Sequence, residues 1–492
     1  MLFFPYRNSV IPRATARLVV GTFCFATLSL PALAAESTAT KSDSERLEKL
    51  ERAVDLLQKR NAELEQEVKS LKKEKSPAPT LSAEKRSKFV PDPKSPVEKT
   101  ETAVEKKPAY VVPGTSEIKL TLGGFIQAQY EAGDISAFEG RFTAGSGKDR
   151  FRLRRARINL VGDFAEKFDF KVEGEFEQSD VGLTVRDATG KTLGSNSTRT
   201  AFGATDIFIN WHEFPEFQVK VGQYKAPFGL EQITSDTKLF GIERSQVTSA
   251  LTPERQLGVQ IWGKPFAGVF PEQKDVLTYY AGIFNGNGRN ISVNDNNEYM
   301  YVGRLELQAL KTKLFNQDAT LKIGGNALFS RDEAGTVLTP VGNVRVGGDG
   351  SLASFTAPSA AERKAYGLDA SFHLGPFDLI GEYLSEEFDG RTVNGVAPLF
   401  KDFRADGYYV QGTYFIIPKK LQLLAKYESF DPGQVAHDDL KTITAGLNYY
   451  IHGDDIKILA NYIHTWSDFR ESNPTFGSDQ FDEIILRLQV IF

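Results

Sequence analysis

The sequence predicts an all-β fold, a 16-stranded antiparallel transmembrane β-barrel preceded by a coiled-coil helix and a disordered linker. Three observations favour this fold. Apolar and polar residues alternate with period two from about residue 117 to the last residue, which is typical of strands with one apolar and one polar face. Short and long connections alternate along the chain. No run beyond the N-terminus holds the ~20 apolar residues that a spanning helix requires, and transmembrane strands need no such run because only every second residue faces lipid.

Residues 1–34 are typical of a secretory signal peptide. Arg7, Arg13 and Arg17 precede or begin an apolar segment at residues 18–30, and Ala32-Leu-Ala34 supplies small residues for cleavage. Cys24, the only cysteine of the chain, lies in this segment. The mature chain is therefore expected to contain no disulfide and no thiol chemistry.

Residues 35–74 are predicted to form a coiled coil, because apolar residues recur at heptad spacing over residues 44–73. One seam position holds Leu47, Val54, Asn61 and Val68, and the other holds Leu50, Leu57, Leu64 and Leu71. Charged residues flank the seam at positions that pair across a parallel partner. A single amphipathic helix is the alternative interpretation. In soluble peptides, Val and one Asn at the first position with Leu at the second favour two strands.

Residues 75–116 are predicted to be an extended linker. They are rich in Pro, Lys, Glu and Ser, a composition that buries too little apolar surface to fold. The whole chain carries a formal charge of −5. The first 34 residues carry +3 and residues 36–116 carry +2, so the barrel segment 117–492 carries −10. This acidic balance gives anions no overall attraction, and anion selectivity would depend on local placement of charge.

Sixteen strands can be placed in residues 117–492 from the alternation and the turn residues. They lie near 117–130, 150–162, 167–177, 204–213, 216–224, 255–265, 276–285, 298–309, 320–330, 362–373, 376–387, 403–416, 419–430, 440–451, 455–467 and 481–492. Short turns follow the even-numbered strands and longer loops follow most odd-numbered ones, as in outer-membrane barrels with both termini inside. The exceptions are a long turn at 264–275 and a short loop at 431–439.

The second strand carries Arg152, Arg154, Arg155 and Arg157 in the sequence Phe-Arg-Leu-Arg-Arg-Ala-Arg-Ile. Strict alternation would place Arg152 and Arg154 on the lipid face together with Ala156, which is costly away from the headgroups. A β-bulge at Arg154–Arg155 would place two residues opposite one and reset the phase. All four arginines would then face the lumen.

The third long loop mixes Phe, Leu and Ile with Lys225, Glu231, Glu243, Arg244 and Arg255 at or near its ends. A loop in solvent does not need these apolar residues. We therefore expect this loop to fold into the lumen, pack on the wall and present charges to the channel.

Four motifs in this order resemble those of the phosphate-selective porin O and P family. They are the arginine strand at 151–158, the sequence Lys-Ala-Pro-Phe-Gly-Leu-Glu at 225–231, Glu-Arg-Ser at 243–245 and Arg-Gln-Leu-Gly at 255–258. The C-terminal Phe492 is similar to the end signal of outer-membrane barrels. The resemblance implies a trimeric 16-stranded porin whose arginines and lysines conduct anions past an inward loop.

The predicted function is therefore an outer-membrane porin for small anionic solutes, phosphate favoured, constricted by the third loop. Arginine suits oxyanions because its planar fork donates two parallel hydrogen bonds and stays charged. The alternative for any single arginine is a structural ion pair that braces the barrel. The residues expected to line the pore are Arg152, Arg154, Arg155, Arg157, Lys171, Lys225, Glu231, Glu243, Arg244 and Arg255.

An enzyme is not expected. The five histidines are scattered without metal-ligand spacing, and the chain contains no P-loop, G-x-S-x-G or H-E-x-x-H motif. We expect no cofactor, no metal site and no nucleic-acid partner.

The expected partners are small anions, outer-membrane lipid and two further copies of the chain in a homotrimer. The coiled coil would lie in the periplasm and share the trimer symmetry of the barrel, despite seam residues that favour dimers. An alternative function is a structural tether, in which the coiled coil contacts the cell wall and the barrel is a general, non-selective pore.

Overall fold

The computed structural model describes residues 110–111, 118–134, 149–176, 184–186, 192–195, 203–269, 274–333, 335, 345–346, 352–353, 358–476 and 478–492. The predicted signal peptide and coiled coil, and nearly all of the linker, lie outside these residues. At the end of the predicted linker, the two-residue strand β1 (Tyr110–Val111) pairs with the start of β2. Within the described residues, no helix is both long and apolar enough to cross a membrane.

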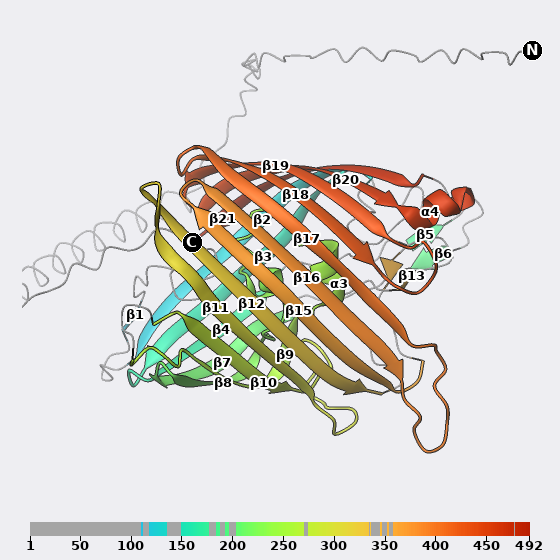
Figure 1. Cartoon of the computed structure of the whole chain (residues 1–492), viewed down its shortest axis with the longest axis horizontal. Helices are drawn as coiled ribbons and strands as arrows, with labels where there is room; N and C mark the ends of the chain where they lie inside the picture. The colour runs from blue at the N-terminus through green and yellow to red at the C-terminus, as the bar shows by residue number, and fades with distance from the viewer. Residues whose placement is uncertain are drawn as a thin grey trace, which may run out of the picture. The chain divides into compact units, whose positions relative to one another are not determined.

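Sixteen long strands form one antiparallel barrel (Figure 1). They are β2 (Lys119–Gly133), β3 (Arg150–Phe164), β4 (Phe168–Glu175), β7 (Gly203–Phe214), β8 (Phe217–Lys225), β9 (Arg255–Gly263), β10 (Leu277–Phe284), β11 (Met300–Leu314), β12 (Gln317–Asp332), β15 (Ala361–Leu374), β16 (Phe377–Gly390), β17 (Phe403–Ile417), β18 (Leu421–Asp431), β19 (Leu440–His452), β20 (Ile456–Ser467) and β21 (Gln480–Ile491). Each pairs with its neighbour in sequence, so the predicted strand number and order are confirmed.

The barrel closes where the first long strand pairs with the last. β2 and β21 run antiparallel from Phe125 opposite Ile491 to Gly133 opposite Glu483. Beyond this ladder, the backbone N–H and carbonyl of Phe492 exchange hydrogen bonds of 3.0 Å with those of Gly124. Closure leaves no unpaired sheet edge, which is what allows strands to cross a lipid layer.

Alternate residues face lipid and lumen along each strand. On neighbouring positions of β11, Leu305 is 58% exposed and Arg304 is 1% exposed; on β15, Leu368 is 64% exposed and Asp369 is 7% exposed. Arg304 and Asp369 form a two-pronged ion pair inside the barrel, with N–O distances of 2.6 and 2.9 Å. The outer face is thus apolar, and the polar side chains gather inside.

The hairpin of β11 and β12 is longer than predicted. The strands end at Leu314 and resume at Gln317, and Phe315 and Asn316 have φ of 52° and 59°, as in a type I′ turn. The prediction ended the first strand near residue 309 and began the second near residue 320. Backbone pairing continues between these points, from Leu310 opposite Leu321 to Leu314 opposite Gln317.

Small elements in the long loops had no signal in the sequence. Two short hairpins form there, and helices occur in the third loop and before β21. They are β5 (Thr184–Arg186) with β6 (Thr192–Ser195), β13 (Arg345–Val346) with β14 (Leu352–Ala353), α2 (Leu230–Ile233), α3 (Gln246–Leu251), α4 (Asp468–Ser472) and the 3-10 helix η3 (Pro474–Phe476).

The predicted bulge on the arginine strand is confirmed. Arg155 lies opposite Gln127 and Leu153 lies opposite Ala128, so Arg154 is the extra residue between them. Phe151 and Leu153 are 87% and 54% exposed on the outer face, while the arginines on both sides of the bulge pair with inward carboxylates.

Deleting Arg154 is expected to leave a stable barrel. Without it, residues 153, 155, 156 and 157 alternate regularly and no side chain changes face. Deleting Ala156 instead would turn Arg155 toward lipid, at a cost of about 2–4 kcal/mol near the middle of the bilayer. The temperature at which each variant loses the faster migration of the folded barrel in SDS gels measures its stability. A barrel that tolerates the second deletion and not the first would contradict the bulge.

Candidate functional site

The third loop, residues 226–254 between β8 and β9, lies inside the barrel. Its residues bond to side chains of β3, β16, β18, β19, β20 and β21, strands far around the ring from those it connects (Figure 1). Only a segment in the lumen can contact all of them. The loop leaves and re-enters the wall at one point, where Ala226 N–H donates to Glu254 O at 3.0 Å.

Apolar residues pack the loop against one side of the lumen. Phe228, Val247 and Leu251 are buried in a cluster with Phe388 of β16 and Phe430 of β18. Burying each such side chain contributes about 1.5–3 kcal/mol. This packing explains why the loop is rich in apolar residues.

Two wall carboxylates bind the N-terminal backbone of the loop helices. Glu382 of β16 accepts hydrogen bonds from Leu230 N–H at 2.5 Å and Glu231 N–H at 3.1 Å. Glu428 of β18 accepts from Gln246 N–H at 2.6 Å. These N–H groups have no partner within their helices. The wall therefore supplies the acceptors that the loop itself lacks.

Other wall side chains hold the tip of the loop. Lys457 of β20 donates to Thr237 O at 2.9 Å, and Asn461 accepts from Ile242 N–H at 2.8 Å. Lys238 forms an ion pair of 2.6 Å with Asp454 in the turn between β19 and β20. Buried backbone groups need such partners, so the path of the loop is fixed along much of its length.

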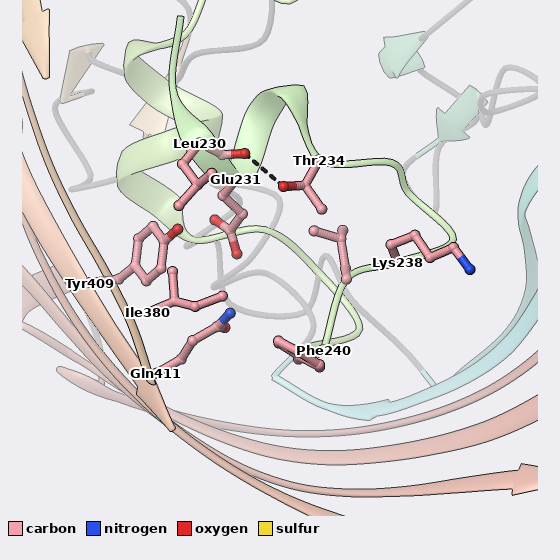
Figure 2. A pocket seen from close by; sticks show the side chains of 9 residues that line it. Leu230, Glu231, Thr234, Lys238, Phe240, Ile380, Tyr409 and Gln411 are labelled. Atoms are coloured by element: carbon pink, nitrogen blue, oxygen red, sulfur yellow. Dashed lines mark hydrogen bonds between the residues drawn. The ribbon is translucent and has the colours of Figure 1, made fainter. Parts of the chain in front are cut away.

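A small cavity lies between α2 and the wall of β16 and β17 (Figure 2). Leu230, Glu231, Ile380, Tyr409 and Gln411 line it, together with side chains of the loop tip. The amide oxygen of Gln411 is buried there without a hydrogen-bond partner among the described residues. Next to this cavity, α2 does not pack directly on the wall and is held there by its hydrogen bonds to Glu382.

The arginines of β3 meet carboxylates of the wall and the loop. Arg157 contacts Glu175 at 2.5 Å, Asp236 at 2.6 Å and Glu173 at 3.7 Å. Arg155 contacts Asp236 at 3.5 Å. These two side chains are 8% and 7% exposed, so they primarily brace the loop against the wall.

Arg152 and Arg154 are more accessible. Arg154 binds Glu243 through two nitrogens at 2.9 and 3.1 Å, and Arg152 lies 3.9 Å from Glu131. Their side chains are 28% and 24% exposed. These two side chains are therefore less enclosed than those of Arg155 and Arg157.

The remaining predicted residues extend the cluster along the wall and into the loop. Lys171 and Arg255 share Asp206, at 2.9 and 2.7 Å. Lys225 and Arg244 both donate to Thr234 O at 2.9 Å, and Arg244 also binds Asp236 at 2.6 Å. Glu231 lies apart from this group and pairs with Lys426 of β18 at 3.1 Å.

Ionisation of the loop carboxylates is stabilised by the surrounding cations. Burial alone would raise the pKa of Asp236, but Arg155, Arg244, Lys225 and Arg157 outweigh it and hold the pKa well below its usual range. The same balance, with Arg154 and Arg487 as the main cations, lowers the pKa of Glu243. Both loop acids remain charged and paired at neutral pH.

Several residues of the site were not predicted as members. Arg487 of β21 binds Glu243 at 2.5 Å and donates to Ile242 O. Asp236 receives three arginines, and Glu382 and Glu428 hold the helices. Period-two alternation does place Arg487 on the lumen face, but nothing in the sequence pairs it with a loop residue 244 positions away.

The ten predicted residues and Arg487, Asp236, Glu382, Glu428 and Lys426 define the candidate site. Among the residues that the structure describes, no three or more His, Cys, Asp or Glu side chains are arranged to hold a metal ion.

A closed 16-stranded barrel with an apolar outer face, a charged interior and an inward loop has the architecture of an outer-membrane porin. Sequence comparison identifies the family. The chain belongs to the phosphate-selective porin O and P family, whose profile matches residues 125–492. The resemblance seen in the motifs is thereby confirmed, and fold and family together indicate a channel rather than an enzyme.

Relatives match most of the barrel. Porin O of Pseudomonas aeruginosa is 24% identical over 425 residues, covering 76% of this chain and 89% of that protein. An uncharacterized protein of Aquifex aeolicus is 26% identical over 305 residues, covering 58% of this chain and 66% of that protein.

Solved structures similar to this chain include an outer membrane channel and an outer membrane protein. The outer membrane channel DcaP of Acinetobacter baumannii has a TM-score of 0.48 at 13% identity, covering 77% of this chain and 98% of that chain. The trimer form of OmpT, an outer membrane protein of Vibrio cholerae, has a TM-score of 0.47 at 12% identity, covering 76% of this chain and all of that chain.

Replacing Glu382 by Ala is expected to loosen the loop without unfolding the barrel. The variant loses the acceptor for two buried N–H groups, each hydrogen bond contributing about 0.5–1.5 kcal/mol. Open-channel current noise in planar bilayers should rise and voltage-induced closure should begin at lower voltage. Glu382→Gln, which keeps one acceptor, should lie between this variant and the parent.

Glu387→Ala, on the other face of the same strand, is the matched control. Equal noise in the Glu382→Ala and Glu387→Ala channels would show that Glu382 does not hold the loop.

Asp454 should make the barrel sensitive to acid. Burial raises its pKa, but Lys457 and Lys238 outweigh this effect and lower the pKa to about 2. Its stabilisation is therefore full above the ordinary carboxyl pKa of about 4 and is lost as pH falls toward 2. Asp454→Asn is expected to lower the free energy of unfolding by about 1–2 kcal/mol at pH 7 and to have a much smaller effect at pH 2, where the carboxyl is about half protonated. Urea unfolding at both pH values tests this, and an equal effect at both would contradict it.

Proposed function

We propose that this porin is a diffusion channel for small anionic solutes, with phosphate favoured, and that the third loop forms its constriction. One observation carries the proposal. Where the loop meets β3, contacts among the described residues bring ten cationic side chains together with six carboxylates. The cations are Arg150, Arg152, Arg154, Arg155, Arg157, Lys171, Lys225, Arg244, Arg255 and Arg487, and the carboxylates are Glu131, Glu173, Glu175, Asp206, Asp236 and Glu243.

This excess of cations suits weak and reversible contact with anions. Channel solutes must shed water at the constriction without binding so tightly that they do not leave. Carboxylates close to each guanidinium compete with a passing anion and limit its residence time. The partly exposed Arg152 and Arg154 offer the forked donors that match phosphate oxygens.

The preference for phosphate follows the description of the family. It is consistent with the local excess of positive charge within a barrel segment of formal charge −10. Local fields of this kind govern which ions enter a narrow lumen. The resemblance also leads us to propose a homotrimer.

Planar bilayers with a KCl gradient test the proposal. The parent channel is expected to give an anion-selective zero-current potential, and phosphate should reduce the chloride current. Arg154→Gln removes one accessible cation while Glu243 keeps its pair with Arg487, so the ratio of chloride to potassium permeability should fall about twofold.

Lys364→Gln is the control, because it removes the same charge from a side chain that is 48% exposed on the other face of the wall. A cation-selective parent channel, or one indifferent to phosphate, would refute the proposal. Equal shifts in the two variants would assign selectivity to net charge rather than to the arginine cluster.

A further inference from the structure

An aromatic surface lines the lumen on β7–β10, toward the end of the barrel that carries most of the short turns. We call it the aromatic patch; it comprises Phe208, Lys220, Tyr224, Trp262, Tyr280 and Phe284. Residues that alternate with its members, among them Ile209, Val221 and Ile261, are 37–51% exposed on the outer face. The patch therefore faces inward.

The rings are arranged as a layer with one accessible part. Phe208, Tyr224 and Phe284 are buried and meet edge to face, with centroids 6.0 and 5.6 Å apart. Trp262 and Tyr280 are half-buried and stack in parallel, with centroids 6.0 Å apart and planes inclined by 7°. The stacked pair thus presents aromatic surface to the lumen.

A lysine ammonium lies beside this surface. Lys220 Nζ is 4.4 Å from the ring centre of Phe208, 5.3 Å from that of Tyr224 and 6.0 Å from that of Trp262. Its side chain is half-buried, so it is reached from the lumen. The indole N–H of Trp262 is already donated to Asn210 Oδ1 at 3.0 Å. Trp262 therefore offers a solute contact with its ring rather than a hydrogen bond from its N–H.

We propose that the aromatic patch is a second solute site, selective for small organic anions that carry a planar ring, such as aromatic carboxylates. The carboxylate contacts the Lys220 ammonium while the ring stacks on Trp262 and Tyr280. Ring stacking adds free energy beyond burial of apolar area, and the cation supplies complementary charge. Phosphate has no planar apolar part and gains nothing from this surface.

This site differs in chemistry and place from the arginine cluster. It rests on the proposed function only in requiring that anions enter the lumen. The two can be tested separately, because inorganic phosphate reports on the arginines and the difference between benzoate and acetate reports on the rings.

Block of chloride current in planar bilayers tests the proposal, with benzoate, cyclohexanecarboxylate or acetate added on both sides. Benzoate should halve the current at a concentration at least ~5-fold lower than acetate. Cyclohexanecarboxylate has a similar apolar size but no planar ring and should resemble acetate more closely. Equal block by benzoate and cyclohexanecarboxylate would overturn the proposal, as would equal block by benzoate and acetate.

Variants locate the block. Trp262→Ala and Lys220→Gln should each raise the half-blocking concentration of benzoate ~3–10-fold and leave the effect of phosphate unchanged. Trp211→Ala is the matched control, because Trp211 meets Phe214 and Phe217 edge to face, and these two rings are exposed on the outer face of β7 and β8. Unchanged benzoate block in Trp262→Ala would overturn the site.

Tyr280→Leu removes the second stacked ring and replaces Trp262→Ala if that variant does not give a heat-modifiable barrel. A parallel loss of phosphate and benzoate effects in any of these variants would assign the block to the arginine cluster and overturn the aromatic site. If only the phosphate effect is absent in the parent channel, the proposed function fails while the aromatic site stands.

Discussion

The third loop is held between side chains of opposite charge, and the interior of the barrel depends on this double anchoring. On one side, arginines of β3 and β21 bind the loop carboxylates Asp236 and Glu243. On the other, the wall carboxylates Glu382 and Glu428 bind loop N–H groups. Polar groups taken from water need such partners. Each anchor satisfies one polar group on the loop and one on the wall. Moving the loop away would therefore leave polar groups on both without a partner.

The anchoring gathers cations on one part of the lumen wall. They lie where the loop meets β3, β4 and β9, together with a smaller number of carboxylates. Burial makes the charges of this cluster more effective than surface charges, since water screens them less. The formal charge of the barrel segment is negative, yet cations outnumber carboxylates beside β3.

Much of the fold was predictable because the bilayer enforces alternation. Each strand was found from the alternation of apolar and polar residues, and the bulge at Arg154 followed from the cost of placing arginine in lipid. The contacts of the third loop could not be predicted in this way. Its apolar composition predicted entry into the lumen, but its anchors join residues such as Ile242 and Arg487, 245 positions apart. Single-sequence periodicity carries no information about such pairs, and a helix of four residues like α2 has no periodicity of its own.

Under the proposed function, bracing and conduction are not alternative roles for the arginines. Arg157 is enclosed by three carboxylates and nearly buried, so its position is fixed and its charge largely matched. Arg154, the residue added by the bulge, shares Glu243 with Arg487 and keeps about a quarter of its surface exposed. The bulge thus adds an accessible arginine to a strand whose regular lumen-facing positions include the buried braces Arg155 and Arg157.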